Sequence, residues 1–404
     1  MWWFLAAGVL AMMMGLTKMA PDGWAYYARE IAEGKEDYFA KEEPGRWLGR
    51  GTDDLGLGGS TEPEGLERLF GEARHPISGE ALGRPFATGK RAVAGYALSF
   101  SPPKSVSVLW ALADDAVATS LRAGHDAAVT AAMGYLDEHA AFTRRGKAGV
   151  LQVDTEGLLA ASFVHRTSRA AHPQLHTHVL LANKVRAVSD GKWLSIDGTE
   201  LYGTQKAAGM LYKAALRAEL TTRLGVTWSE VDANGIAEID GVPHDLIEHW
   251  SKRRQEVKAM ASALIAGREA ALGRSLSSTE RSEAHQLAAY RTRGAKAEDI
   301  RSTAELRAAW REEVEAQGLG PERWAKDVLG RQPRRSPPLE QSVLEHPAFE
   351  HSALLSRARD ILEESASTWT RAEATEVLTT QCRPGQESPV KRPCSRWSGP
   401  ASIR

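Results

Sequence analysis

The chain has 404 residues, of which 42% are hydrophobic and 25% charged, an ordinary composition for a soluble globular protein with a sizeable core. Its formal net charge of -1 excludes a protein that is basic overall, so any contact with nucleic acid must come from local basic clusters. Its two cysteines, Cys382 and Cys394, lie in a tail rich in Pro, Ser and Arg. Their position argues against a disulfide scaffold or a thiolate metal site and fits a cytoplasmic protein.

The chain begins with an apolar run, MWWFLAAGVLAMMMGL. No Lys or Arg precedes this run, and a membrane-spanning helix needs ~20 apolar residues. We therefore favour a buried N-terminal strand over a signal peptide or a membrane anchor. The alternative is an extension upstream of a start at Met12, Met13 or Met14.

The order of predicted strands and helices indicates the fold class. Residues 96–100 form a predicted strand that runs into SPPKSVSVLW, and residues 114–139 have helical spacing. The segments VLQVDTEG and LLAASFVH are predicted strands joined by a turn at Glu156–Gly157. Residues 175–188 form another predicted strand, followed by a turn and KWLSI. Several strands with hairpin-like connections predict an α+β fold with a mainly antiparallel sheet covered by helices.

Three of the twelve histidines, His165, His176 and His178, lie close together in the sequence. On a strand, residues two apart share a face, so His176 and His178 point one way and Thr177 the other. His165 ends the preceding predicted strand, and a short loop brings it beside the pair if the two strands are neighbours. Three neutral imidazoles predict a divalent-metal site with open coordination positions. The alternative is a chance His-x-His pair on a polar sheet face.

The N-terminal segment WAYYAREIAEGKEDYFAKE contains Tyr26, Tyr27 and Tyr38. A tyrosine activated by a divalent cation and a base can attack phosphorus, although its ordinary pKa of ~10 makes it a poor nucleophile alone. The phosphotyrosyl ester formed would be similar in energy to the phosphodiester broken, so the step is reversible and needs no nucleotide cofactor. The alternative is that these tyrosines form the aromatic face of an amphipathic helix.

Basic residues near the histidines are candidate contacts for the phosphates of a DNA single strand. They are Lys104 in SPPKS, Arg166 and Arg169 beside the histidines, and Lys184 after the His-x-His strand. A further cluster in FTRRGKAG fits a solvated turn equally well. No phosphate-loop motif is present, because GRPFATGKR has five residues between its glycines and Arg91 where Ser or Thr is required.

Several of these segments together resemble one family, the MobF conjugative relaxases, which are the TrwC/TraI-like group of HUH endonucleases. The resemblance extends from about Leu16 to about Trp310. It rests on YY…DYF, WLGRGTDDLGLGG, GYALSFSPPKSVSVLW, HRTSRAAHPQLHTHVLLANKV and KWLSIDGTELY. The His-rich block with an upstream His, and with tyrosines N-terminal to it, is the most specific of these features.

The resemblance implies a five-stranded antiparallel sheet, called the palm, covered by helices, with a helical C-terminal extension that grips DNA. It implies a metal-dependent endonuclease and strand transferase that nicks one strand at a plasmid transfer origin, with relaxosome accessory proteins as possible partners. Tyr26 matches the leading catalytic tyrosine, with Tyr27 beside it, and Tyr38 matches the tyrosine of a second transfer. His165, His176 and His178 match the metal ligands, with Mg²⁺ or Mn²⁺ as the ion.

The resemblance also divides the chain. We expect an apolar extension at 1–14, a catalytic core at 15–235, a DNA-gripping helical part at 236–330, and a linker with a disordered tail at 331–404. Many family members continue into a helicase half, and STWTRAEATEVL resembles its start. Because TQCRPGQESPVKRPCSRW follows, we expect a truncated or frameshifted relaxase that nicks DNA but does not unwind it.

The chain departs from the family pattern at two further positions. Ala97 stands where members commonly carry an Asp that orients a ligand histidine or helps to take the tyrosine proton. His172, which we interpret as a loop residue, stands where members often carry Asp. The general base is therefore open: Asp154 or Glu156 could substitute, or the metal alone could suffice.

Two alternatives come from other functional classes. A non-haem iron or cupin-type oxygenase would use the same histidines, but that class usually adds a carboxylate and leaves the tyrosines without a role. A DNA-binding remnant without catalytic activity is suggested by Ala97. Changing Tyr26 and Tyr27 to Phe separates these alternatives from the relaxase, since neither depends on a tyrosine nucleophile.

Overall fold

A computed structural model describes most of the chain up to residue 330. The described residues are 14–25, 44–87, 92–168, 170–232, 234–292, 302–320 and 324–330. The predicted catalytic tyrosines, Tyr26, Tyr27 and Tyr38, lie outside them, as does Arg169. Most of the apolar N-terminal run and the tail from residue 331 also lie outside.

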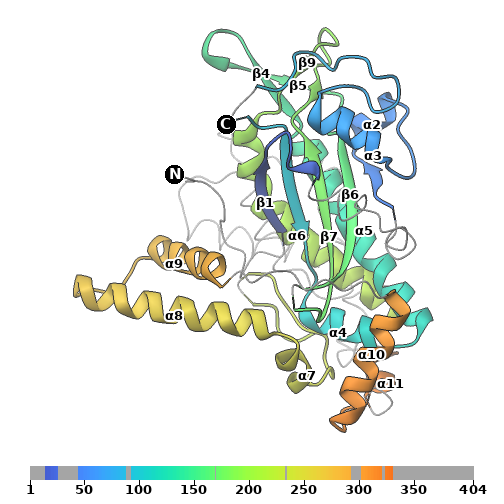
Figure 1. Ribbon diagram of the computed structural model, residues 1–404, viewed down its shortest axis with the longest axis vertical. Coiled ribbons are helices and arrows are strands. Elements are labelled where there is room, and N and C mark those ends of the chain that lie inside the picture. The colour runs from blue at the N-terminus through green and yellow to red at the C-terminus, as the bar shows by residue number, and fades with distance from the viewer. Residues whose placement is uncertain are drawn as a thin grey trace, which may run out of the picture.

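The centre of the protein is a five-stranded sheet in which every neighbouring pair of strands is antiparallel (Figure 1). Its order is β1-β3-β7-β6-β2. The strands are β1 (Met14–Met19), β2 (Arg46–Leu48), β3 (Gly95–Phe100), β6 (Ala160–Thr167) and β7 (Pro173–Ala182). The predicted α+β class and the five-stranded antiparallel palm are therefore confirmed.

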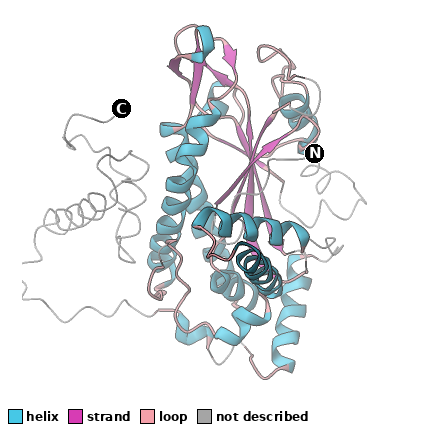
Figure 2. Cartoon of the chain, turned by 90° about the vertical axis from the view of Figure 1, so that its left-hand side faces the viewer, coloured by secondary structure: helices cyan, strands magenta, loops and turns pink. Residues whose placement is uncertain are grey.

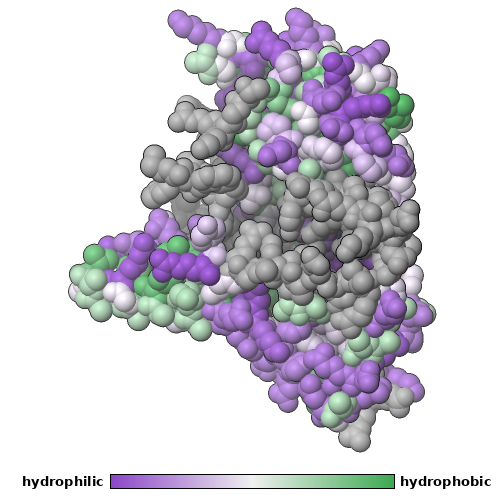
Figure 3. Space-filling model, viewed as in Figure 1, coloured by the Kyte–Doolittle hydropathy of each residue, from purple (hydrophilic) through white to green (hydrophobic). Residues whose placement is uncertain are grey.

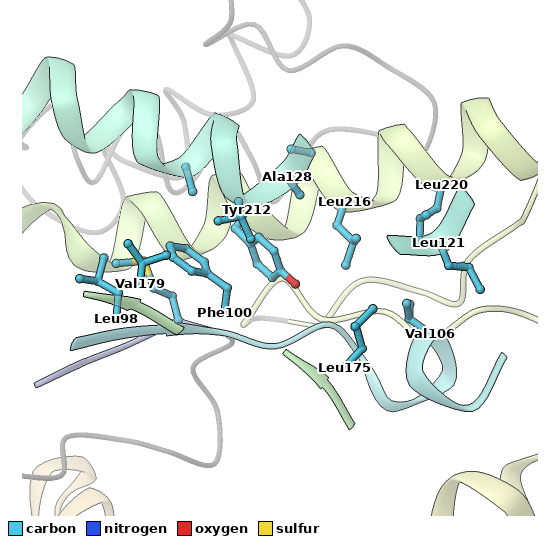
Figure 4. Packing of buried hydrophobic residues seen from close by; sticks show 14 of the residues in the cluster. Leu98, Phe100, Val106, Leu121, Ala128, Leu175, Val179, Tyr212, Leu216 and Leu220 are labelled. Carbon is cyan, nitrogen blue, oxygen red and sulfur yellow. The ribbon is translucent and has the colours of Figure 1, made fainter. Parts of the chain in front are cut away.

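Two long helices, α5 (Asp115–His139) and α6 (Gly198–Leu224), cover one face of the sheet (Figures 1 and 2). Each begins at an Asp whose carboxylate accepts a hydrogen bond from a backbone N–H in the first turn, which satisfies a donor that the helix leaves free. Alternate residues of β7, including Leu175, Val179 and Leu181, are fully buried against these helices (Figure 4). This alternation produces the main core.

Among the described residues, an apolar cluster covers one end of the second face of the sheet. The chain there forms α2 (Arg50–Asp54), α3 (Pro63–Leu66) and a π-helical turn, η1 (Glu67–Gly71). Leu66, Leu69 and Phe70 are buried in a cluster with residues of β6 and β7. The predicted metal ligands lie on the same face, towards the other end of these two strands.

Two small two-stranded sheets lie beyond the apolar end of the main sheet (Figure 1). They pair β4 (Phe142–Arg145) with β5 (Leu151–Asp154), and β8 (Val185–Arg186) with β9 (Trp193–Leu194). A 3₁₀ turn, η2 (Lys147–Gly149), joins β4 to β5. The two strands predicted in VLQVDTEG and LLAASFVH are present as β5 and β6, but the hairpin-like connection is wrong, because β5 pairs with β4 and β6 pairs with strands of the main sheet.

The strand predicted at 175–188 is two strands separated at Asn183. The Asn183 side chain donates to the Val93 carbonyl and accepts from the Ile196 backbone N–H, at 2.8 and 3.0 Å. These bonds hold the chain where it leaves the main sheet. As a result β7 ends at Ala182, and β8 belongs to a different sheet.

Helices follow the sheet, as the predicted helical extension requires. A short helix, α4 (Lys104–Leu112), closes the end of the sheet at which β7 starts. The C-terminal helices are α7 (His244–His249), α8 (Lys252–Leu272), α9 (Ser278–Arg291), α10 (Thr303–Ala316) and α11 (Ala325–Val328). In the part of the chain that the structure describes, no helix is both long and apolar enough to cross a membrane.

Helices α8 and α9 lie side by side and project away from the sheet (Figure 1). They share a small apolar cluster formed by Val257, Ala261, Ala288 and Ala289. Hydrophobic patches are visible over this pair in Figure 3. Helix α10 returns to the core, where the Arg307 guanidinium donates to backbone carbonyls at the C-terminal end of α4.

Candidate metal centre

Strands β6 and β7 bring the three predicted ligand histidines together. In the antiparallel register, the Cα of His165 lies opposite that of His176. The ring centroid of His165 is 5.3 Å from that of His176 and 5.1 Å from that of His178, and the latter two are 5.0 Å apart. Thr177 is buried on the other face of the sheet, as the strand periodicity predicts.

A tight turn between the two strands produces this arrangement. The Ser168 N–H donates to the His172 carbonyl at 2.9 Å, and the Ser168 hydroxyl accepts from the N–H of His172 at 3.3 Å. Ala171, at φ 56°, adopts the left-handed conformation that closes the turn. The indole N–H of Trp310 in α10 donates to the Ala171 carbonyl at 3.1 Å. His172 is therefore a loop residue, as expected, in a turn held by a distant helix.

The proton position on His176 follows from its hydrogen bond. Its Nδ1 lies 2.8 Å from the carbonyl oxygen of Gln174, which can only accept. Nδ1 therefore carries a proton, so Nε2 is the nitrogen that could bind an ion. Metal-binding histidines are commonly held in this way, with one nitrogen donating to a carbonyl and the other free to bind the ion.

The ring spacing fits three imidazoles around one ion. An ion ~2.1 Å from each nitrogen lies about 3.2 Å from each ring centroid, so rings at tetrahedral angles have centroids about 5.2 Å apart. The observed 5.0 to 5.3 Å matches that spacing. Within the described ranges, however, no group of three or more His, Cys, Asp or Glu side chains already has the arrangement of a formed ion site. Binding would require one nitrogen of each ring to point at a shared ion position.

Ala97 lies on the same face of the sheet as the histidines. In the register of β3 and β7, Ala97 is opposite Leu180, and Ser99 is opposite His178. A side chain at position 97 is therefore a diagonal neighbour of His178. A carboxylate there would lie near the predicted ligands, whereas the methyl group of Ala97 is buried in the apolar cluster.

The two acidic residues considered as substitutes lie at the wrong end of β6. Asp154 belongs to β5, and the N–H of Glu156 donates to the Arg186 carbonyl beside the small sheets. Both precede Ala160, the first residue of β6, whereas His165 lies near its far end. Five strand residues span about 17 Å. Neither carboxylate is placed to act as a base at the histidines.

Two lysines predicted to contact DNA are buried and bonded to backbone carbonyls. The Lys104 amine donates to the Pro173 carbonyl at 2.5 Å, and burial lowers its pKa to about 7. The Lys184 amine donates to the Arg84 carbonyl and lies 5.1 Å from the centre of the Phe86 ring. Their geometry supports a structural role better than a phosphate contact. Arg166 is partly exposed in β6 beside His165.

The motif SPPKSVS connects the start of β7 to its surroundings, a role that the sequence did not reveal. The Ser107 hydroxyl accepts from the N–H of Leu175 at 3.1 Å, next to the bond from Lys104 to Pro173. The Ser105 hydroxyl accepts from the N–H of Ile239 at 2.8 Å. The motif itself was recognisable, but its partners lie far along the chain.

Comparisons with known proteins agree with this arrangement. The family model described as TrwC relaxase matches residues 20–317. The multifunctional conjugation protein TraI of Escherichia coli (strain K12) is 36% identical over 233 residues, which are 55% of this chain and 13% of that protein. The chain thus spans only a small part of that relative.

Solved structures of a conjugative relaxase are also similar to this chain. The conjugative relaxase TrwC in complex with oriT DNA, in a metal-bound structure, has a TM-score of 0.58 at 27% identity, covering 76% of this chain and 98% of that one. A copper-bound structure of the same relaxase with oriT DNA has a TM-score of 0.59 at 26% identity, with the same coverage. A further TrwC complex holds a 27-mer DNA comprising the recognition hairpin and the cleavage site.

Proposed function

The chain belongs to the TrwC relaxase family, and from this membership we propose that it is a conjugative relaxase that nicks one strand of transfer-origin DNA. The observation that carries the proposal is the convergence of His165, His176 and His178 on one face of the sheet, with ring centroids 5.0 to 5.3 Å apart. The matching relaxase structures hold oriT DNA, which supports the same substrate class here.

We propose Tyr26 as the leading nucleophile, with Tyr27 beside it and Tyr38 for a second transfer. The deprotonated tyrosine oxygen attacks the scissile phosphorus, a phosphotyrosyl bond forms, and the bond to the leaving sugar oxygen breaks. That oxygen takes up a proton and becomes a free hydroxyl group. The reverse attack by a hydroxyl group rejoins the strand, so the energy of the phosphodiester is conserved without a nucleotide cofactor.

We propose that the three imidazoles hold a divalent ion, with Mg²⁺ or Mn²⁺ as the ion in the cell. When bound, such an ion supplies Lewis-acid stabilisation of charge on the phosphate oxygens. The donor chemistry fits, because a neutral imidazole is a good metal ligand and the bond from Nδ1 of His176 to the Gln174 carbonyl makes Nε2 the nitrogen that would face an ion. Metal-bound relaxases among the similar structures, one of them with copper, support a divalent metal. Three imidazoles alone would favour a softer ion than Mg²⁺.

The remaining assignments are proposals of the same kind. Residues 15–235 would be the catalytic core, 236–330 the DNA-gripping helices and 331–404 a linker and tail. Arg166 and Arg169, which flank the histidines in the sequence, are the proposed phosphate contacts, and the buried Lys104 and Lys184 suit that role less. Relaxosome accessory proteins are further possible partners, and the cytoplasm is the proposed location.

A covalent-adduct assay tests the proposal. The full chain is mixed with labelled single-stranded transfer-origin DNA and Mn²⁺, with and without a chelator, and run on a denaturing gel. We expect a metal-dependent shifted band that disappears when Tyr26 and Tyr27 are both changed to Phe. Tyr202→Phe is the matched control. Tyr202 lies in α6 and packs against Tyr96, at the end of the sheet away from the three histidines. An adduct that maps to another residue would refute the assignment of Tyr26.

A second candidate function is a DNA-binding remnant without catalytic activity. Ala97 is the specific observation that favours it, because neither Asp154 nor Glu156 is placed to supply the missing carboxylate. Retained binding to the cognate origin with no adduct would support this candidate.

A further inference from the structure

A buried network of hydrogen-bonded side chains lies on the opposite side of β7 from the three predicted ligand histidines. His125, in the middle of α5, is fully buried beneath the sheet. Its Nε2 lies 2.8 Å from the Thr177 hydroxyl, and its Nδ1 lies 2.9 Å from the Tyr212 hydroxyl of α6. Thr177 stands between His176 and His178 in the sequence. The network therefore joins α5 and α6 to Thr177, the β7 residue between two predicted ligands.

The side chains around this network are apolar. Tyr212 packs against Phe100, with ring centroids 5.3 Å apart, among Val179, Leu216 and other core residues (Figure 4). A polar group in such a place is destabilising unless it is hydrogen-bonded, and an apolar side chain would fill the space without that requirement. Fully bonded buried networks instead fix one arrangement of the elements that they join.

The charge state of the network suits its place. Burial, followed by the nearby charges of Arg122 and His176, lowers the pKa of His125 to about 3. The ring is therefore neutral at physiological pH, and in either tautomer one nitrogen donates while the other accepts. Burial also raises the pKa of Tyr212 well above its ordinary value, so its hydroxyl keeps its proton. A neutral network adds no positive charge beneath a site that would bind a divalent cation.

We propose that His125 is a positioning residue for the metal centre, acting through its hydrogen bond to Thr177. The bond ties the middle of β7 to α5, so His176 and His178 cannot tilt or shift relative to His165 on β6. Small displacements matter at such a site, because ligand nitrogens must lie within a few tenths of an ångström of their ideal distance from the ion. This inference rests on the proposed function, since it needs the histidines to be ligands.

The test compares two changes of Thr177 that remove opposite parts of its side chain. Thr177→Val keeps the branched shape and removes the hydroxyl, and Thr177→Ser keeps the hydroxyl and removes the methyl group. Thr143→Val is the matched control, because Thr143 is an equally buried threonine in β4, away from the histidines, and its hydroxyl donates to the Ser195 carbonyl. Mn²⁺ affinity of the full-length protein is measured by calorimetric titration, with the melting temperature of the metal-free protein recorded alongside.

We expect Thr177→Val to weaken Mn²⁺ binding roughly tenfold. This is the low end of the effect of removing a group that supports the metal ligands without binding the ion. Thr177→Ser and Thr143→Val should stay within about twofold of the wild type. His125→Gln, which keeps an amide near the hydroxyl, should lose less affinity than His125→Phe.

Unchanged Mn²⁺ affinity in Thr177→Val would overturn the inference. Loss in Thr177→Ser equal to that in Thr177→Val would also overturn it, because packing of the methyl group would then be responsible. Failure of the wild-type protein to bind Mn²⁺ would instead refute the proposed metal centre, and this inference with it. Because the wild type is titrated in the same series, the two failures are distinguishable.

Discussion

The two ends of one sheet face differ in what covers them. At one end, Leu66, Leu69 and Phe70 are buried against β6 and β7. Towards the other end, the same two strands carry three imidazoles instead of aliphatic side chains. Both ends follow the same strand alternation, so the backbone does not distinguish them. The comparison teaches that the proposed metal site differs from its surroundings in side chains alone, because potential ligands there replace aliphatic residues on an otherwise regular sheet.

The comparison predicts that the two ends can be damaged separately. Phe70→Ala should lower the free energy of unfolding by about 3–5 kcal/mol, because a fully buried aromatic side chain leaves a cavity. Adduct formation per folded molecule should be unchanged. Urea unfolding gives the first quantity, and the adduct assay at a temperature where the variant is folded gives the second. A variant that is fully folded yet inactive would contradict the separation of the two ends.

His178→Ala should have the reverse effect. Removing one of three proposed ligands should weaken Mn²⁺ binding and slow adduct formation by about 100-fold, the upper range for perturbing a metal site. The free energy of unfolding of the metal-free protein should change little, because the ring is only partly buried. His75→Ala is a control, since His75 lies outside the main sheet and its Nδ1 accepts from the backbone N–H groups of Ile77 and Ser78 in a turn. Wild-type Mn²⁺ affinity in His178→Ala would remove His178 from the ligand set.

The pH dependence of stability should reveal the buried network beneath the histidines. The pKa of His125 falls from 6.5 to about 3 on folding, so the unfolded chain takes up a proton at a higher pH than the folded one. The contribution of His125 to the free energy of unfolding is fully present above pH 6.5 and is lost as the pH falls towards 3. Between pH 7 and pH 5 the loss should be about 2 kcal/mol. Urea unfolding at the two pH values should show that the free energy of unfolding of His125→Gln falls by about 2 kcal/mol less than that of the wild type. An equal fall in both proteins would show that His125 does not titrate on unfolding.

Ala97→Asp should change the histidine end in the opposite direction. The new carboxylate would lie on the ligand face, diagonal to His178, where it can orient an imidazole or accept the tyrosine proton. We expect adduct formation to rise about tenfold, measured as the initial rate in the gel assay. Ala97→Asn is the matched control, since it has the same shape without the charge. An equal rise in both variants would point to a hydrogen bond instead of a carboxylate.

Local periodicity was sufficient to predict how the three histidines are arranged. The two-residue repeat of a strand placed His176 and His178 on one face and Thr177 on the other, and the short loop placed His165 beside them. The sheet class followed from the same patterns. These features depend on contacts within about fifteen residues of sequence, which a single chain displays directly.

Long-range contacts explain what the sequence did not show. The partner of β5 is β4 and not β6, which the local pattern at Glu156–Gly157 does not determine. Lys104 had the appearance of a surface cation, but its amine bonds to a carbonyl 69 residues away. His125 was one of twelve scattered histidines, and its partners lie 52 and 87 residues away. Pairing across such distances depends on the assembled helices and sheet.

The smallest expected effect concerns the basic residues. Arg166→Ala, beside His165, should lower the slope of log affinity against log salt concentration for single-stranded DNA by about 0.7, the value for one phosphate contact. Lys104→Met should leave the slope unchanged, because the Lys104 amine is already bonded to the Pro173 carbonyl. Binding measured by fluorescence anisotropy at several salt concentrations gives both slopes. If Lys104→Met lowered the slope as much as Arg166→Ala, the Lys104 amine would have to leave its carbonyl for a phosphate, and the start of β7 would rearrange when DNA binds.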